Sequence, residues 1–168
     1  MELYVVRHAI AVDHGDPAYP NDDDRPLTPE GIHKFRLAAR GLKEIGAKPK
    51  RIVSSPLVRA RQTAEILRDM VAPNVEITIS KALHPATSYA DVVKEVRKYK
   101  EDVIAVVGHE PHLSGLTSYL LMGGGQAAAI EFKKGAVARI LFEDGPAAGS
   151  GMLEWLIQPG ALRMLAKD

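Results

Sequence analysis

An uninterrupted apolar run from Val103 to Val107 constrains the fold of this chain more than any other feature. A strand that is apolar at every position has both faces covered, as in the centre of a parallel sheet between two helix layers. Shorter β-type runs lie at residues 2–7, 51–54 and 75–79, and longer helical segments alternate with them. This alternation predicts a three-layer α/β/α sandwich with a mostly parallel central sheet.

The longer segments carry apolar residues at helical spacing. The first begins at Thr28, an N-cap residue with Pro29 in the first helical position, and it ends near Gly46. Further helices are predicted over about 56–71, 88–99 and 111–122. Residues 11–26 are predicted to form a loop, because they are dense in Pro, Gly, Asn and Asp.

The last third of the chain predicts a region of antiparallel strands. We expect strands over 129–132 and 136–142 on either side of a Lys-Lys-Gly turn. Another strand, over 152–157, is expected to pair antiparallel with its neighbour, and a short helix follows from Pro159. Because no linker or repeat interrupts the sequence, we predict one domain over residues 1–168.

Composition excludes several classes of protein. The formal net charge is only +1, so the surface as a whole offers no electrostatic footprint for nucleic acid. Cysteine is absent, which excludes disulfides, thiolate metal sites and a cysteine nucleophile. No apolar stretch approaches the ~20 residues of a membrane span, and the first residues lack the regions of a secretory signal. We therefore expect a cytoplasmic monomer that binds neither nucleic acid nor a membrane.

Four basic side chains follow strands of the predicted sheet. Arg7 and His8 end the first strand, Arg59 lies in the first turn of a helix, and His109 follows Gly108 after the central strand. Ligands of open α/β sheets bind at the carboxyl ends of the strands, so we expect these side chains to converge. The sequence therefore predicts a phosphate pocket with a histidine nucleophile.

Each of these residue types suits phosphoryl transfer. A neutral imidazole at His8 is a good nucleophile near neutral pH. The guanidinium groups of Arg7 and Arg59 match phosphate geometry and keep their charge, and a protonated His109 would donate to a phosphoryl oxygen. A lone histidine more often caps a strand end or bonds within a loop. The arginine beside His8 and the second histidine favour the catalytic interpretation.

Neighbouring polar residues receive a structural interpretation. Ser54 and Ser55 are expected to cap the helix that carries Arg59, without a chemical role. Arg61 points to a different face of that helix and is expected to be a solvated surface arginine.

Metal binding is the competing interpretation of the six histidines. None shows the helical i, i+4 spacing or the nearby carboxylate pattern of a zinc or two-metal site. His109 and His112 stand three positions apart, which is a thin signal. We expect neither a metal ion nor a cofactor.

Three motifs resemble those of the histidine phosphatase superfamily, the group that includes the phosphoglycerate mutases. They are Val-Val-Arg-His-Ala at the start, Ser-Ser-Pro-Leu-Val-Arg-Ala-Arg-Gln-Thr-Ala in the middle and Val-Val-Gly-His-Glu-Pro later. The small SixA-type phosphohistidine phosphatases are the most similar members, and Arg25 to Gly31 looks like the segment before their first helix. The resemblance covers residues 3–112.

The resemblance implies a role for each matching residue. His8 becomes the phosphorylated nucleophile, and Arg7, Arg59 and His109 complete the phosphate pocket. Arg25 lies at the pocket rim and binds substrate in this interpretation. A salt bridge from Arg25 to Asp22, Asp23 or Asp24 is the equally open alternative.

The family pattern is broken at the general acid. In the mutase-like branch a Glu shortly after the strand that here spans 75–79 protonates the leaving group, whereas this chain has Ala-Leu-His-Pro there. The residues that could replace it are His84, Glu110, Asp13 and Asp16. Imidazole leaves a phosphohistidine more easily than an alkoxide leaves a phosphate ester, because the ring can itself be protonated. The missing acid therefore favours a phosphoramidate substrate.

The preferred hypothesis is a phosphohistidine phosphatase that acts on a phosphorylated protein of the histidine-phosphotransfer type. Residues 11–26 are the only substantial cover that we expect over the site, and an open pocket accepts a phosphorylated side chain of a folded partner. Two alternatives remain. The same pocket could hydrolyse a small phosphoester metabolite, or the chain could be a phospho-ligand binding module without turnover.

Overall fold

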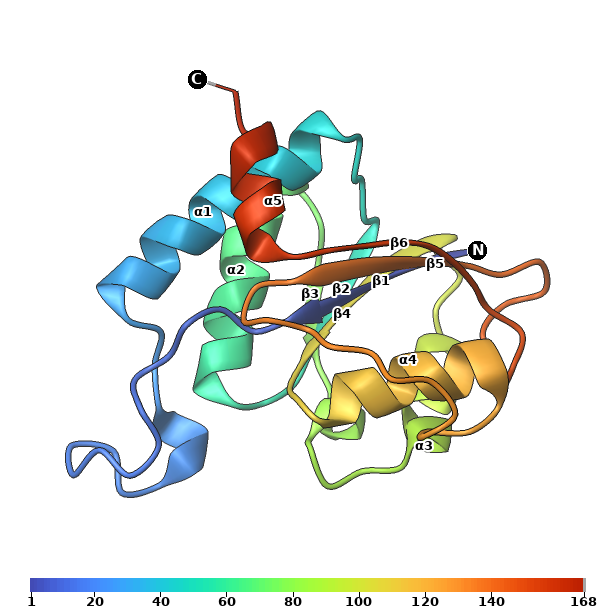
Figure 1. Ribbon diagram of the computed structural model, residues 1–168, viewed down its shortest axis with the longest axis horizontal. Coiled ribbons are helices and arrows are strands. Elements are labelled where there is room, and N and C mark those ends of the chain that lie inside the picture. The colour runs from blue at the N-terminus through green and yellow to red at the C-terminus, as the bar shows by residue number, and fades with distance from the viewer. Residues whose placement is uncertain (168) are drawn as a thin grey trace.

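A six-stranded sheet separates two layers of helices in the computed structural model, which describes residues 1–167 (Figure 1). The strands are β1 (Glu2–Arg7), β2 (Arg51–Ser54), β3 (Ile77–Ile79), β4 (Val103–Gly108), β5 (Val137–Leu141) and β6 (Met152–Ile157). The helices are α1 (Pro29–Glu44), α2 (Val58–Val71), α3 (Tyr89–Val96), α4 (His112–Met122) and α5 (Pro159–Leu165), with 3-10 turns η1 (Asp22–Asp24) and η2 (Lys81–Leu83). This architecture confirms the predicted α/β sandwich.

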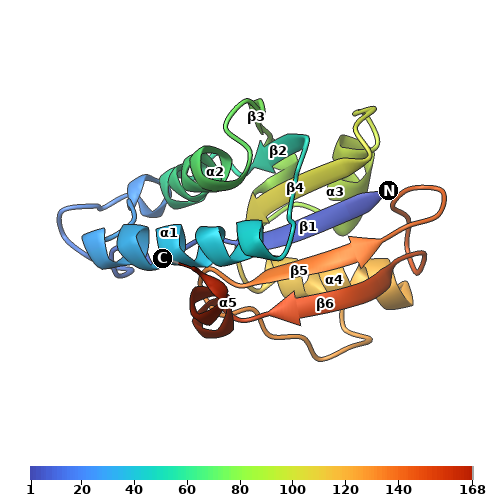
Figure 2. The same cartoon turned by 90° about the horizontal axis from the view of Figure 1, so that it is seen from above.

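The sheet has the strand order β3-β2-β4-β1-β5-β6 (Figure 2). Strands β1 to β4 are parallel, with Val5 opposite Val106 in the pairing of β1 with β4. Strand β5 pairs antiparallel with β1, and β6 pairs antiparallel with β5, as predicted for the C-terminal region. The carboxyl ends of the four parallel strands therefore meet at one edge of the sheet.

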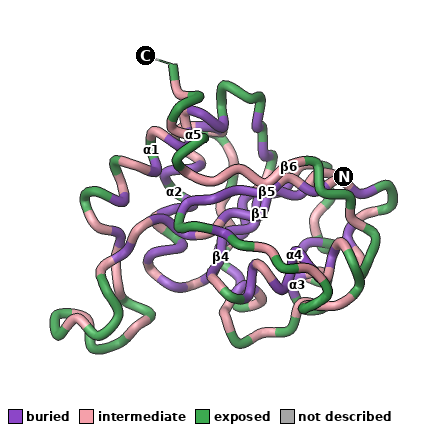
Figure 3. The backbone as a smooth tube through the Cα atoms, viewed as in Figure 1, coloured by how far each residue is buried: buried purple, intermediate pink, exposed green. Residues whose placement is uncertain are grey.

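Helices α1, α2 and α5 cover one face of the sheet, and α3 and α4 cover the other (Figure 1). Because side chains alternate along a strand, β1 sends Tyr4 and Val6 to the first layer and Leu3 and Val5 to the second. In β4 every residue from Ile104 to Val107 is 0% exposed, which confirms the two-sided burial predicted from its sequence. The buried strands form the centre of the molecule in Figure 3.

The first turn of α1 confirms its predicted cap. Thr28 adopts an extended conformation, and its hydroxyl accepts a hydrogen bond from the backbone N–H of Gly31 at 2.9 Å. Pro29 occupies the start of the helix. The backbone carbonyl of Ile10 lies against Gly31, where an added Cβ would be 2.0 Å from that oxygen, so α1 begins directly beside the segment that follows β1.

The predicted strand over 129–132 is wrong, because these residues pair with no strand. Their backbone groups bond to side chains instead. Arg7 Nη1 donates to the carbonyl of Phe132 at 2.6 Å, and Gln158 Nε2 donates to the carbonyl of Glu131 at 2.8 Å. The other boundaries differ by a few residues, and the third predicted helix ends at Val96 rather than near residue 99. Within residues 1–167 no helix is long and apolar enough to cross a membrane.

Candidate active site

His8 lies directly after β1 at the carboxyl edge of the sheet and is only 7% exposed. Its backbone N–H donates to the carbonyl of Gly108 at 3.0 Å, so the residue is fixed against the end of β4. Its ring Nδ1 lies 2.7 Å from the carbonyl oxygen of Ala9. A carbonyl oxygen only accepts, so Nδ1 carries the proton and Nε2 of the neutral ring holds the free lone pair.

The surroundings of His8 favour this neutral form. Burial lowers its pKa from 6.5 to about 3, although the bond to Ala9 acts in the opposite direction. The positive charges of Arg59, Arg7 and Lys134 lower the pKa further. The ring is therefore unprotonated at neutral pH, which is the state that a histidine nucleophile requires.

His109 lies at the end of β4 beside His8, and the two ring centroids are 5.2 Å apart. Burial is the main reason that its pKa falls well below 6.5, followed by the charges of His8 and Arg59. Its Nδ1 is buried and has no hydrogen-bond partner within residues 1–167. A bound phosphoryl group would raise this pKa, because a nearby opposite charge favours the protonated ring.

Ser55 contacts the second histidine, which the sequence analysis did not anticipate. Its Oγ lies 2.7 Å from Nε2 of His109 and also accepts from the backbone N–H of Leu57 at 3.4 Å. The expectation that Ser54 and Ser55 cap the helix is wrong, because the N-cap of α2 is Leu57 without a side-chain cap bond and Ser54 Oγ donates to the carbonyl of Ser55 at 3.0 Å. The sequence signal for this contact is the position of Ser55 directly after β2, because the end of β2 lies at the same edge of the sheet as His109.

Arg59 and Arg7 bring their guanidinium groups to this edge. Arg59 lies in the first turn of α2 and is 5% exposed, and Arg7 ends β1. Burial lowers the pKa of both, whereas the charge of Asp22 raises that of Arg59 and the charge of Glu110 raises that of Arg7. Each retains a buried Nε without a hydrogen-bond partner in the described chain, so each has donor capacity left for an anion. Arg61 is exposed, as predicted.

Asp22 ties the loop at residues 11–26 to Arg59. Arg59 Nη2 donates to Asp22 Oδ2 at 3.0 Å, and its Nη1 donates to the Asp22 carbonyl at 2.8 Å (a link that sequence reasoning missed). Arg25 Nε and His14 Nδ1 donate to the other carboxylate oxygen at 2.7 and 2.8 Å. Partial burial raises the pKa of Asp22, but these bonds and the charge of Arg59 hold it well below its ordinary value. Of the two possibilities left open for Arg25, the structure contains the salt bridge.

Comparison with known proteins places these motifs in a family. The model of the histidine phosphatase superfamily (branch 1) matches residues 3–85. An uncharacterized protein of Picosynechococcus is 35% identical over 127 residues, which are 73% of this chain and 74% of the relative. The phosphohistidine phosphatase SixA of Escherichia coli is 27% identical over 169 residues, 98% of either chain. The chain belongs to the histidine phosphatase superfamily.

The fold gives the same assignment. The solved structure of the protein histidine phosphatase SixA complexed with tungstate superposes with a TM-score of 0.82 and 26% sequence identity. The match covers 96% of this chain and 99% of that chain. Membership of the superfamily and likeness to SixA support a phosphatase function for this chain.

His84 is the one acid candidate that is not a carboxylate. The residue is half-buried and follows η2. Its Nδ1 accepts from the backbone N–H of Ala86 at 3.3 Å, so the neutral ring carries its proton on Nε2. Electrostatic interaction with His84 is among the causes, after burial, His8 and Arg59, that lower the pKa of His109. His84 is thus an N–H donor within electrostatic reach of the site.

Two of the three carboxylate candidates hold local turns, and the third is exposed. Glu110 accepts from the backbone N–H of Ser114 at 2.9 Å and from its hydroxyl, so it caps the first turn of α4. Asp13 is exposed, and Asp16 holds a turn of the loop by accepting from the N–H of Ala18 at 2.8 Å. Within residues 1–167 no three His, Asp or Glu side chains are placed to hold a metal ion.

Proposed function

We propose that this protein is a phosphohistidine phosphatase that removes the phosphoryl group from a histidine of a partner protein through an intermediate on His8. The observation that carries the proposal is the hydrogen bond of 2.7 Å between His8 Nδ1 and the Ala9 carbonyl. It leaves the Nε2 lone pair of a buried, neutral ring among Arg7, Arg59 and His109. The likeness to SixA over 98% of the chain supports the same substrate class.

The first step transfers the phosphoryl group to the enzyme. His8 Nε2 attacks the phosphorus, the P–N bond to the substrate imidazole breaks, and a new P–N bond forms on His8. The guanidinium groups of Arg7 and Arg59 neutralise the phosphoryl oxygens, which is the main contribution a protein makes to this reaction. His109, protonated in the presence of the anion, donates to the same oxygens.

The second step regenerates the enzyme. Water attacks the phosphorus, the P–N bond to His8 breaks, and inorganic phosphate leaves with both protons of the water. Nδ1 of His8 stays bonded to Ala9 throughout, so the electron pair returns to Nε2 and the starting tautomer is restored.

The lack of a positioned carboxylate acid among the candidates within residues 1–167 supports this substrate class. A phosphohistidine ring can take a proton on its other nitrogen before the P–N bond breaks, so it leaves as neutral imidazole. An alkoxide needs a positioned acid worth ~10²–10⁴-fold in rate. Neither Asp13 nor Asp16 is positioned as an acid that protonates a leaving alkoxide, and Glu110 caps α4.

The test measures phosphate release from two substrates in parallel, with a chelator present. One is a phosphotransfer domain carrying phosphohistidine, the other an aryl phosphate, and His8→Ala is the control for both. We expect faster, His8-dependent turnover of the phosphohistidine. Turnover of the aryl phosphate alone would indicate a small-molecule phosphatase, and turnover of neither would indicate a binding module.

A further inference from the structure

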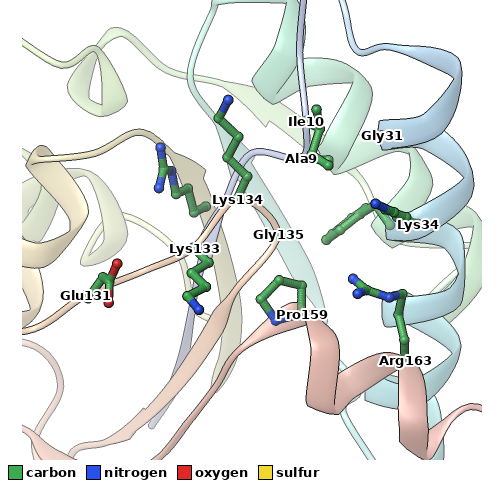
Figure 4. Close-up of a pocket in the computed structure, with 12 residues that line it drawn as sticks. Ala9, Ile10, Gly31, Lys34, Glu131, Lys133, Lys134, Gly135, Pro159 and Arg163 are labelled. Carbon is green, nitrogen blue, oxygen red and sulfur yellow. The ribbon is translucent and has the colours of Figure 1, made fainter.

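A pocket of about 460 Å³ adjoins the candidate active site (Figure 4). Arg7 lines it and also belongs to the candidate phosphate pocket, so the two share this side chain. Its other walls come from the segment after β1, the first half of α1, the loop before β5 and the start of α5. The lining residues are Arg7, Ala9, Ile10, Gly31, Lys34, Phe35, Glu131, Lys133, Lys134, Gly135, Pro159 and Arg163. We call this the basic pocket.

Positive charge is concentrated in the basic pocket. Five of its side chains are cationic and one is a carboxylate, whereas the whole chain has a net charge of only +1. Lys133, Lys134 and Arg163 form no salt bridge within residues 1–167, and Lys34 pairs with Glu30 on the exposed surface of α1. In Figure 4, Lys34 and Arg163 lie on the helix side, across from Lys133 and Lys134. Lys133, Lys134 and Arg163 are therefore available to an external anion.

The loop that carries the two lysines is fixed to the nucleophile. The backbone N–H of Gly135 lies 3.2 Å from the carbonyl of Arg7 and 3.1 Å from that of His8, and it donates to both. Gly135 has a φ of +85°, a left-handed conformation that favours glycine and turns the chain back into β5. The charge of Lys134 contributes to the lowered pKa of His8. The loop that forms one wall of the basic pocket is therefore held directly beside the reacting atoms.

The form of the pocket indicates the kind of anion it takes. Its cations come from the end of β1, α1, α5 and a loop, and both lysines of the loop are exposed. Between them lies an apolar floor that includes Phe35 and Pro159. A compact phosphate or metabolite is held by converging, buried donors, whereas dispersed cations around an apolar floor match several carboxylates spread over a protein surface.

We infer that the basic pocket docks an acidic surface of the phosphoprotein substrate beside its phosphohistidine. The inference rests on the proposed function and specifies its substrate. Carboxylates of the partner bind Lys133 and Arg163 while the phosphohistidine enters between Arg7 and Arg59. Docking raises the affinity for the partner and the rate of association. It leaves the rate of the chemical step unchanged, because charge pairs at the periphery act mainly on the encounter of the two proteins.

The test reverses two charges of the basic pocket in the double variant K133E/R163E. The matched control is K48E/K100E, which makes the same charge change at two exposed lysines before β2 and β4, at the opposite edge of the sheet. Both variants and the wild type are assayed with a phosphohistidine-bearing phosphotransfer protein and with an aryl phosphate. Retained aryl phosphatase activity shows that the variant is folded.

We expect K133E/R163E to lower kcat/KM for the phosphoprotein about tenfold or more, mainly through KM, and to change that for the aryl phosphate less than twofold. The kcat/KM of the neutral variant K133Q/R163Q for the phosphoprotein should lie between those of the wild type and K133E/R163E. The control K48E/K100E should match the wild type. Added salt should reduce phosphoprotein turnover by wild type more steeply than by the reversed variant.

Each contrary result has a distinct meaning. Equal losses on both substrates, or phosphoprotein turnover that the pocket substitutions do not change, overturn the docking inference alone. Wild-type protein that hydrolyses the aryl phosphate but not the phosphoprotein overturns the proposed function, and the docking inference with it.

Discussion

Acid should destabilise this protein through the two histidines of its active site. Burial lowers the pKa of His8 from 6.5 to about 3, and it lowers that of His109 even more strongly. The unfolded chain therefore binds a proton on each ring below pH 6.5 that the folded protein does not bind. This stability is fully present above pH 6.5 and is lost as the pH falls toward the folded pKa.

The size of the loss follows from these values. For His8, integrating the difference in bound protons between pH 7.5 and 5.0 gives about 2 kcal/mol. His109 contributes about the same, so the two together lower the free energy of unfolding by about 4 kcal/mol. That is a large part of the ~5–15 kcal/mol of a typical domain. Asp22 acts in a different pH range. Because its pKa is lowered in the folded protein, the stability that it contributes is lost only below about pH 4.

The assay is urea denaturation of the wild type and His8→Asn across this pH range. Because asparagine does not titrate, the variant should lose about 2 kcal/mol less than the wild type between pH 7.5 and 5.0. His33→Asn is the matched control, since His33 is exposed on α1. Parallel curves for wild type and His8→Asn would mean that His8 has the same pKa in the folded and the unfolded protein, and the argument that burial lowers its pKa would be refuted.

Three further predictions concern the second histidine, the helix packing and the metal. His109→Gln should lower kcat about 10²–10³-fold with less effect on KM, in steady-state phosphate release, and an unchanged kcat would exclude its role as a donor. Gly41→Ala should destabilise the fold by about 1–3 kcal/mol in thermal unfolding, because the new Cβ would lie 1.9 Å from the Leu162 carbonyl. Gly124→Ala, with its nearest contact at 3.7 Å, is the control, and equal losses would contradict that packing. Prolonged dialysis against a chelator should leave phosphatase activity unchanged, and a loss restored by a divalent metal would contradict the metal-free mechanism.

The fold could be predicted where local pattern and burial agree. The apolar run of β4 predicted its central, doubly covered position, and Thr28 with Pro29 predicted the start of α1. The strand expected over 129–132 failed because no strand lies beside it, and only Phe132 among its residues is buried. The side chains of Arg7 and Gln158 bond to its carbonyl groups, and a sequence pattern does not reveal such distant partners.

The candidate site was predictable to the extent that strand ends define it. The parallel order of β1, β2 and β4 brings His8, Arg59 and His109 to one edge, as expected from the motifs. The contact of Ser55 with His109 and that of Asp22 with Arg59 were missed. Both depend on side-chain directions and on a loop that folds back, and neither is encoded in residue spacing.

The measurement that tests the central claim most directly is isolation of the phosphorylated enzyme. The wild type is mixed with a phosphohistidine-bearing protein, denatured in alkali because the P–N bond is acid-labile, and digested for mass spectrometry. The proposed mechanism predicts one phosphoryl group on the peptide that contains His8, and none in His8→Asn. Rapid phosphate release with no phosphorylated His8, or with the group on another residue, would contradict it.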